Sequence, residues 1–150
     1  METSNKPLGM VVGQMMKEIF QVLKKRVDKQ SGSKITMEQF GLLHAISKEK
    51  VDVIQKDMAE IMGKDKSAIL RMIDSLEEKD FVRRVVDKND RRKNYIMVSK
   101  KGEQTLEQHL KIASELSDEL LEGLSQSEIE TFYSVIDYIK RKAEKLKTNS

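Results

Sequence analysis

The sequence predicts a mainly α-helical protein with one small β-hairpin. Over most of the 150 residues, apolar side chains recur at spacings of three and four, which is the period of an amphipathic helix. Residues 81–98 depart from that period, because two short runs of β-branched and aromatic residues flank a segment rich in Asn and Asp. Such runs are typical of two strands joined by a turn.

Composition narrows the classes of protein to consider. Charged residues make up 35% of the chain and aromatic residues 5%, whereas soluble domains average about 25% charged residues. This balance favours one domain of long, partly exposed helices that share a core with a partner chain. Cysteine is absent, which excludes disulfides, thiolate metal sites and cysteine redox switches. No apolar run approaches the roughly 20 residues of a membrane span, and no signal peptide is evident, so we expect a cytoplasmic protein.

Two helices are predicted in the N-terminal third. The first runs from about Leu8 to Lys29 and has one apolar side, formed by Leu8, Val11, Val12, Met15, Ile19, Val22 and Leu23. A loop at residues 30–33 follows. Thr36 then caps a short second helix, and Gln39 reaches back to complete a capping box. Residues 51–53 are a candidate third strand beside the hairpin.

The next segment has the pattern of two helices joined by a tight turn. The first helix carries an apolar face of Ile54, Met58, Ile61 and Met62. Gly63 can adopt the left-handed conformation that ends a helix, and Asp65 can cap the next one. That second helix, from about Asp65 to Lys79, has an apolar stripe of Ile69, Met72, Ile73 and Leu76. The order is the helix-turn-helix signature, although two ordinarily packed helices would show the same spacing.

The opposite face of the second helix suits a polyanionic groove. It begins with small and basic groups, in the order Lys66, Ser67, Ala68, Leu70 and Arg71. A helix that enters a narrow groove needs such a face near its N-terminus, where the helix dipole also favours phosphate.

The hairpin that follows is strongly basic. Its turn, residues 87–93, carries Arg91, Arg92 and Lys93 at the tip. Between residues 79 and 101 there are nine Lys or Arg and three Asp, a local net charge of +6, whereas the whole chain carries +3. Such a concentration of charge is expected of a nucleic-acid binder. The hairpin is therefore interpreted as a wing beside the second helix, and a solvated basic loop is the alternative.

Two long helices complete the chain. Ser99 can cap a helix that extends to about Glu122, lined by Leu106, Leu110, Ala113, Leu116, Leu120 and Leu124. Ser125 and Glu128 form a second capping box. The last helix has a heptad-like seam of Ile129, Phe132, Ile136, Ile139, Ala143 and Leu146. This seam can belong to an intrachain core, but in so charged a chain we expect it to meet a second copy.

These motifs together resemble the winged helix of the MarR family of bacterial transcription regulators. The resemblance rests on the DKS start of the second helix, its Arg71 and Asp74, the LEEKDFV exit, the DRR tip and the SKKG start of the next helix. It extends outward to ITMEQFGLLHAI and LSQSEIETF. It implies a winged helix-turn-helix with long N- and C-terminal dimerisation helices. One MarR-type domain would span 1–150, with its core at 34–100 and dimerisation helices at 8–30 and 100–147.

The resemblance also implies a homodimeric repressor that reads a pseudo-palindromic site in double-stranded DNA. Two recognition helices would then occupy half-sites about one DNA turn apart. By resemblance, Arg92 enters the minor groove and Asp90 orients it through an ion pair. The expected DNA-binding residues are Gln55, Lys56, Lys64, Lys66, Ser67, Ala68, Leu70, Arg71, Asp90, Arg91, Arg92 and Lys93. The expected dimer interface comprises Leu8, Val12, Met15, Ile129, Phe132, Ile136, Ile139 and Ala143.

The chain departs from its relatives at two places. They often read S-T-V-S-R in the recognition helix, whereas this chain has Ala68 and Leu70 in place of two hydroxyl residues. Methyl groups can pack on thymine in the major groove, so we expect a site richer in A·T at those steps. In relatives, the helix that precedes the recognition helix usually starts with Ser or Thr, whereas this chain has Ile54 at that position.

A small effector is the remaining expectation from the resemblance. Relatives commonly bind aromatic or lipophilic anions, and the candidate pocket is lined by Met16, Phe20, Phe40, His44 and His109, with ordinary core packing as the alternative. Some relatives sense zinc near His44 and His109, but Ala113 stands where a paired His is needed, so no metal and no cofactor are expected. No catalytic motif is visible, so we expect no enzyme. A zinc-responsive regulator and a winged-helix protein-interaction module remain alternatives.

Overall fold

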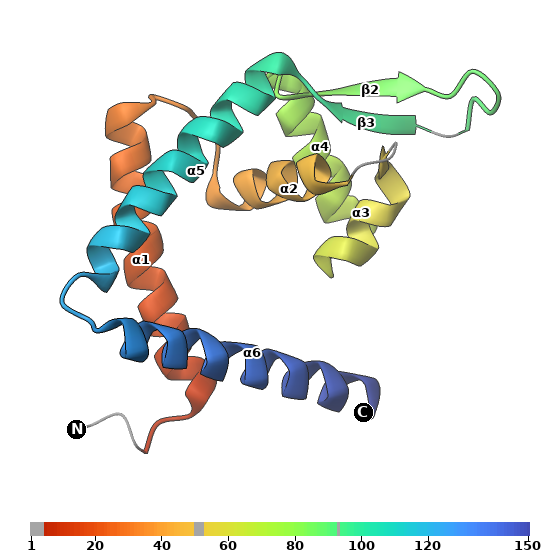
Figure 1. Ribbon diagram of the computed structural model, residues 1–150. Helices are drawn as coiled ribbons and strands as arrows, with labels where there is room; N and C mark the ends of the chain where they lie inside the picture. The colour runs from red at the N-terminus through yellow and green to blue at the C-terminus, as the bar shows by residue number, and fades with distance from the viewer. Residues whose placement is uncertain (1–4, 50–52, 93) are drawn as a thin grey trace. The chain divides into compact units, whose positions relative to one another are not determined.

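The computed structural model describes residues 5–49, 53–92 and 94–150. It contains six α-helices and three short strands within these residues (Figure 1). The elements are α1 (Leu8–Gln30), α2 (Met37–Lys48), β1 (Val53–Ile54), α3 (Gln55–Met62), α4 (Lys66–Glu78), β2 (Val82–Val86), β3 (Asn94–Val98), α5 (Lys100–Leu121) and α6 (Gln126–Thr148). The predicted class, mainly α with a small β-wing, is confirmed.

The structure divides into two compact units, Met1–Ala113 and Ser114–Ser150. The first contains α1 to α4, the sheet and the first part of α5, and the second contains the end of α5 and all of α6. The single-domain organisation expected from the sequence stays a prediction. None of the described helices combines the length and apolar character that a membrane span requires.

The predicted helix starts are confirmed, because each depends on residues within one turn. The Thr36 hydroxyl accepts a hydrogen bond from the Gln39 N–H at 3.1 Å, and the Gln39 side chain accepts one from the Thr36 N–H at 3.1 Å. Asp65 Oδ1 accepts from the Ala68 N–H at 2.8 Å at the start of α4. The two predicted serine caps are also formed, at Ser99 and Ser125.

The turn between α3 and α4 has the predicted backbone. Gly63 has a φ of 61°, in the left-handed region that a side chain disfavours. At the other end of α4, Asp80 adopts a φ of 65° without being glycine. These two residues bound the helix that the sequence identified as the recognition helix.

The strands form one antiparallel sheet in the order β1-β3-β2. Val53 pairs with Ile96, so the candidate third strand is present, although residues 51 and 52 lie outside the described part. In the hairpin, Arg84 pairs with Ile96 and Val86 with Asn94. Strand β2 therefore lies at an edge of this sheet.

The core of the first unit lies among α2, α3, α4 and the sheet, which Figure 1 draws close together. The predicted stripe of α4 is buried at Ile69, Ile73 and Leu76, while Met72 is half-buried. The other buried members of this core are Leu42, Leu43, Ile46, Met58, Phe81, Val82, Ile96 and Leu106. Burial of these side chains is what fixes α4 against the sheet.

The predicted apolar side of α5 is buried only in part. Leu110 and Leu120 were expected on its apolar side, but they are 44% and 49% exposed. The buried side chains of this helix include Leu106, His109, Ile112 and Leu116. The expected line of leucines ignored His109 and Ile112, which lie at the same helical spacings as the buried leucines.

The apolar side chains of α6 have little cover in the single chain. No residue of α6 is buried, and Phe132 and Leu146 are 42% and 61% exposed. In α1, Leu8, Val12 and Met15 are also exposed. Ile129, Ile136 and Ile139 are half-buried.

Candidate nucleic-acid interface

Helix α4 has two faces, as predicted. While its apolar stripe faces the core, Lys66, Ser67 and Arg71 are exposed and Leu70 is 44% exposed. Ala68 is half-buried, and its N–H is held by Asp65. The helix therefore presents basic, hydroxyl and methyl groups to solvent from its first two turns.

The residues expected before α4 are less completely described. Lys64 is exposed in the turn, and its Nζ lies 3.8 Å from Glu38 Oε1 at the surface. Gln55 and Lys56 begin α3, where the structure describes the backbone alone. Their assignment to phosphate contacts stays a prediction.

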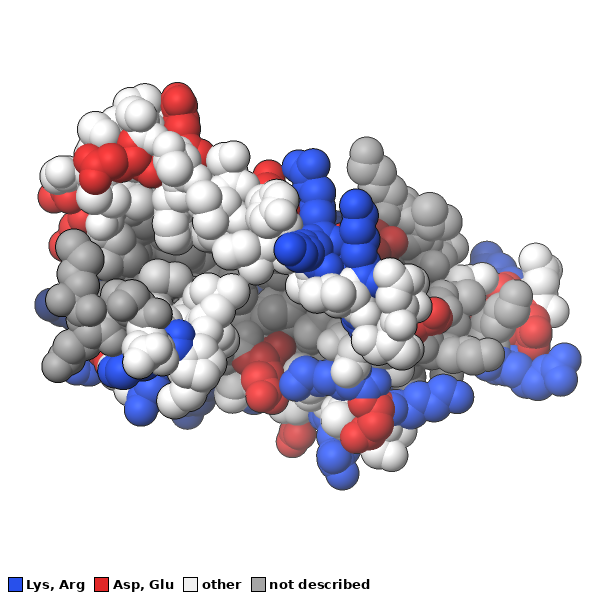
Figure 2. Space-filling view, turned by 90° about the horizontal axis from the view of Figure 1, so that it is seen from below, with Lys and Arg blue, Asp and Glu red and all other residues white. Residues whose placement is uncertain are grey.

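The tip of the wing is exposed and internally ordered. The side chain of Arg92 is 93% exposed, and its Nε lies 3.4 Å from Asp90 Oδ1. The same oxygen accepts the Arg92 backbone N–H at 3.0 Å, so the expected ion pair is present. Arg91 is exposed as well, and Lys93 lies outside the described residues. The loop between β2 and β3 lies at the right of Figure 1, and at the right end of Figure 2 basic and acidic side chains lie next to one another.

A second carboxylate organises the base of the turn. Asp87 accepts the Asn89 N–H at 2.8 Å and, through its other oxygen, the Tyr95 hydroxyl at 2.7 Å. These bonds tie the end of β2 to β3 and hold the turn that carries Arg91 and Arg92.

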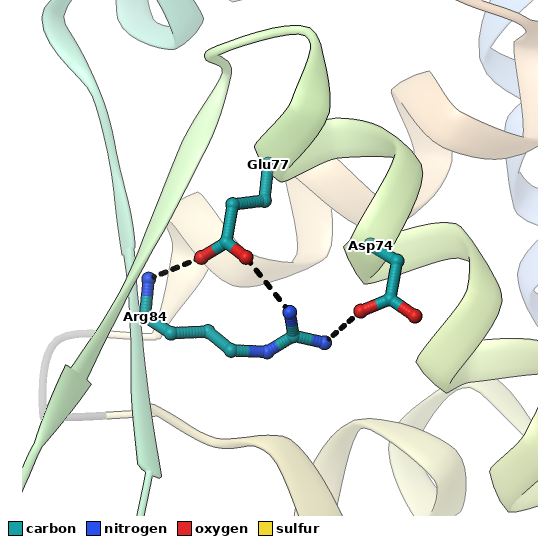
Figure 3. Close-up of polar contacts among 3 residues, drawn as sticks. All are labelled: Asp74, Glu77 and Arg84. Carbon is teal, nitrogen blue, oxygen red and sulfur yellow. Dashed lines mark hydrogen bonds and ion pairs between the residues drawn. The ribbon is translucent and has the colours of Figure 1, made fainter.

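Helix α4 and the wing hairpin are joined by a residue that sequence reasoning missed (Figure 3). Arg84 of β2 donates from Nη1 to Glu77 Oε1 at 2.9 Å and from Nη2 to Asp74 Oδ1. Its backbone N–H donates to Glu77 Oε2 at 3.0 Å. Burial lowers the pKa of Arg84, but hydrogen bonds and charges from Asp74 and Glu77 outweigh it and raise the pKa overall. The signal in the sequence was Asp74 and Glu77, one turn apart in a helix followed by a basic strand.

A polar network joins α4 to the start of α2. Gln39 Nε2 donates to Ser75 Oγ at 2.8 Å, and Lys79 Nζ donates to Gln39 Oε1 at 3.0 Å. Lys79 Nζ also donates to the Lys34 carbonyl at 2.9 Å. Sequence reasoning assigned Gln39 to the capping box alone and missed these contacts.

The candidate pocket residues are only partly brought together. The Phe40 ring stacks on His109 at 4.8 Å between centroids and lies 6.2 Å from His44. Met16 is half-buried and Phe20 is 42% exposed, both on α1. A cavity of about 510 Å³ lies beside His109, lined otherwise by Lys24, Val27, Asp28, Gly32, Ser33, Lys34, Ile35, Thr36 and Met37. Of the five expected residues, only His109 is part of this lining.

His109 is buried, and its Nδ1 lies 3.2 Å from the Thr105 carbonyl. Burial lowers the pKa of its imidazole, because desolvation disfavours the charged ring, and the Thr105 carbonyl opposes this only in part. In the parts of the chain that the structure describes, no three His, Cys, Asp or Glu side chains group to hold a metal ion. His109 is thus a buried polar group whose hydrogen bond lies within its own helix.

The fold and this surface define a winged helix-turn-helix protein. The model of the MarR family matches residues 35–93, from the segment before α2 to the wing loop. Over this segment the chain is similar to the MarR family, and a transcriptional regulator of that family from Rhodococcus sp. RHA1 shares the fold at 18% identity with a TM-score of 0.72, over 93% of this chain and 96% of that one.

The similarity to solved structures of the same fold covers nearly the whole chain. The structure of FabT from Streptococcus pneumoniae in complex with DNA matches with a TM-score of 0.80 at 16% identity, over 93% of this chain and 96% of that one. The MepR–DNA complex from S. aureus matches with a TM-score of 0.77 at 20% identity, over 92% and 99%. A mutant MarR from E. coli complexed with operator DNA matches with a TM-score of 0.73 at 23% identity, over 89% and 93%.

Proposed function

We propose that this chain is a sequence-specific regulator that binds double-stranded DNA as a homodimer and represses transcription by occupying its site. One observation carries the proposal: the exposed, basic start of α4 and the exposed arginines of the wing belong to one compact unit and are joined through Arg84. A regulator of this kind would act in the bacterial cytoplasm, where its DNA lies.

The proposed contacts separate into two groups. Lys66, Ser67 and Arg71 begin the helix that would lie in the major groove, where Ser and Arg can bond base edges or phosphates. Arg92 would enter the minor groove, because a narrow A·T-rich groove has an enhanced negative potential. Lys64, Gln55, Lys56, Arg91 and Lys93 would hold the phosphate backbone. The three DNA complexes that share this fold support DNA binding as the function.

Two side chains suggest a base preference. Leu70 is 44% exposed and Ala68 is half-buried, so methyl groups are available at two positions where relatives often have hydroxyls. Methyl groups gain contact with the thymine methyl but cannot bond to the edge of a G·C pair. We therefore expect A·T pairs at the steps that these residues face.

Exposed apolar surface supports the homodimer. Leu8, Val12 and Met15 on α1 are exposed although they lie on its apolar side, and no side chain of α6 is buried. Exposed stripes of this length favour association with a second copy. The proposed interface adds Ile129, Phe132, Ile136, Ile139 and Ala143.

The cavity beside His109 supports a small effector. Its volume of about 510 Å³ falls within the roughly 300–1,000 Å³ of small-molecule sites. Lys34 supplies positive charge, whereas Lys24 pairs with Asp28 of the same lining at 2.8 Å, and Val27, Ile35 and Met37 supply apolar surface. Such a lining suits a small aromatic or lipophilic anion, whose binding would change the affinity for DNA by coupling between the two sites.

The experiment that tests the proposal is selection from random duplex DNA at physiological salt, followed by sequencing. We expect enrichment of a two-fold symmetric site with half-sites about 10 base pairs apart. If a folded dimer enriches no sequence, a salt titration on arbitrary DNA separates the alternatives. Binding that weakens steeply with salt would indicate phosphate contacts alone, and absence of binding would favour a winged-helix module that contacts proteins.

A further inference from the structure

We propose that Arg84 is a positioning residue: it holds the wing at a set orientation to the recognition helix, so that both engage the same DNA duplex. The inference rests on the proposed DNA-binding function and assigns a role to a residue that need not touch DNA itself.

The geometry of the contact carries the inference. Asp74 and Glu77 lie one turn apart on α4, and Arg84 reaches both from the middle of β2 (Figure 3). Glu77 receives two hydrogen bonds from the same residue, one from the guanidinium at 2.9 Å and one from the backbone N–H at 3.0 Å. The helix therefore holds the strand itself as well as a side chain.

The chemistry of the side chain makes this contact directional. A guanidinium is planar and presents its N–H groups in a fixed fork, so two carboxylates bound to it fix its orientation. The Arg84 side chain is 21% exposed, whereas those of Asp74 and Glu77 are 57% and 41% exposed. An ammonium group in its place would supply a point charge without the fork.

The position of the contact links the two proposed reading elements. Three residues before Asp74, the same helix presents Arg71 to solvent, and the strand that carries Arg84 leads to Arg92 at the tip. Strand β2 is at the sheet edge, paired on one side by β3. The contact with α4 supports its other side. Loss of the Arg84 guanidinium would leave only the backbone N–H bond to Glu77, which would let the hairpin tilt while the core stays folded.

A double-mutant cycle on the full-length protein tests this role. We expect Arg92→Ala to weaken DNA binding about tenfold in the wild-type background, as for a lost groove contact. In the Arg84→Met background, the same substitution should change the Kd by less than about twofold, because the displaced wing no longer places Arg92 in the groove. A purely stabilising role for Arg84 would leave the full tenfold effect of Arg92→Ala.

Arg83 supplies the matched control. It is the exposed neighbour of Arg84 on the same strand and is paired with Met97. A cycle of Arg83→Met with Arg92→Ala should be additive, because Arg83→Met removes the same charge without removing the contact to α4. Arg84→Lys should fall between wild type and Arg84→Met. If the Arg84 cycle is additive like the Arg83 cycle, the positioning role is overturned.

A second measurement is independent of DNA. Residual dipolar couplings of the β2 and α4 amides should fit one alignment in the wild type and two in Arg84→Met. If Arg84→Met does not fold, Glu77→Gln replaces it in both experiments, because this variant keeps an acceptor but loses the charge. If the couplings of the variant fit one shared alignment, the positioning role of Arg84 is refuted. If the wild-type protein binds no duplex, the DNA-binding function is refuted, and the couplings alone then test whether Arg84 holds the wing to α4.

Discussion

Gln39 on α2 donates a hydrogen bond to the Ser75 hydroxyl on α4 at 2.8 Å, although 36 residues separate them in sequence. The oxygen of the same amide accepts from the Thr36 N–H and from Lys79 Nζ. One buried side chain thus completes the cap of α2 and also bonds to α4. Because Lys79 also bonds the Lys34 carbonyl, the network extends from α4 to the loop that lines the cavity beside His109.

Replacing Gln39 with Leu should lower the free energy of unfolding by about 1–3 kcal/mol, because Ser75, Lys79 and the Thr36 N–H would lose a partner. Urea denaturation with an unchanged m-value would measure this loss. The control is Gln104→Leu at an exposed position of α5, which should change stability by less than about 0.5 kcal/mol. Equal midpoints for the two variants would contradict the structural role of the network.

Gly102→Ala should destabilise the protein by about 1–3 kcal/mol, because a Cβ there would lie 2.2 Å from the Phe81 carbonyl oxygen. That oxygen already accepts the Ser99 N–H at 2.9 Å, so the start of α5 packs directly on the strand entry. Gly41→Ala in α2 is the matched control, since a Cβ there has nothing within 4 Å. This substitution should raise the free energy of unfolding by about 0.5–1 kcal/mol. Thermal unfolding should show a lower Tm for Gly102→Ala and a higher Tm for Gly41→Ala than for the wild type. An unchanged Tm for Gly102→Ala would show that α5 can move away from the Phe81 carbonyl without cost.

Asp80→Gly should raise the free energy of unfolding by about 0.5–1 kcal/mol. A left-handed φ of 65° strains any L-residue with a Cβ by about 1–2 kcal/mol, and the greater freedom of glycine in the unfolded chain returns part of that gain. Asp80→Ala keeps the strain and serves as the comparison in the same denaturation experiment. A lower stability for Asp80→Gly would mean that the Asp80 carboxylate contributes more than the backbone costs.

Arg92→Ala should weaken DNA binding about tenfold and reduce the slope of log Kd against log salt by about 1, because one positive charge leaves the interface. The side chain is 93% exposed, so the fold should be unaffected. Binding titrations between low and physiological salt measure both quantities. Unchanged affinity and slope would remove the wing tip from the proposed interface.

Stability should depend on pH through His109. Burial lowers the pKa of His109 in the folded state below its ordinary value of 6.5, so the unfolded chain takes up the proton first as the pH falls. The contribution of this group to stability is therefore present above pH 6.5 and is lost as the pH falls toward the folded-state pKa. Denaturation at pH 7.5 and 5.5 should show a smaller loss for His109→Gln than for the wild type. A loss of the same size in both proteins would exclude His109 as its source.

Local signals account for the parts of the fold that could be predicted. The caps at Thr36, Asp65 and Ser125 each depend on a partner three residues away, so the sequence alone contains both ends of every bond. The alternation of apolar and basic residues likewise identified the exposed face of α4. The Asp90–Arg92 ion pair also spans only two residues, and it was expected from the resemblance to the MarR family.

Long-range contacts could not be predicted from these signals. Arg84 can reach Asp74 and Glu77 only because Phe81 and Val82 are buried in the same core as α4, which brings the start of β2 against that helix. The cavity lining was also missed, because it combines the end of α1, the loop at 32–36 and His109. Aromatic and histidine residues in the sequence pointed to the neighbouring Phe40 stack instead.

The sequence by itself determined where the helices and strands begin, which side of α4 faces solvent, and that positive charge gathers in the wing. These properties follow from interactions within one or two turns of chain. Only the tertiary structure decided which polar groups meet across elements: Gln39 with Ser75, and Arg84 with Asp74 and Glu77. The reason is physical: hydrogen bonds form only within about 3 Å, and side chains from different elements come that close only after apolar burial has fixed the elements against one another.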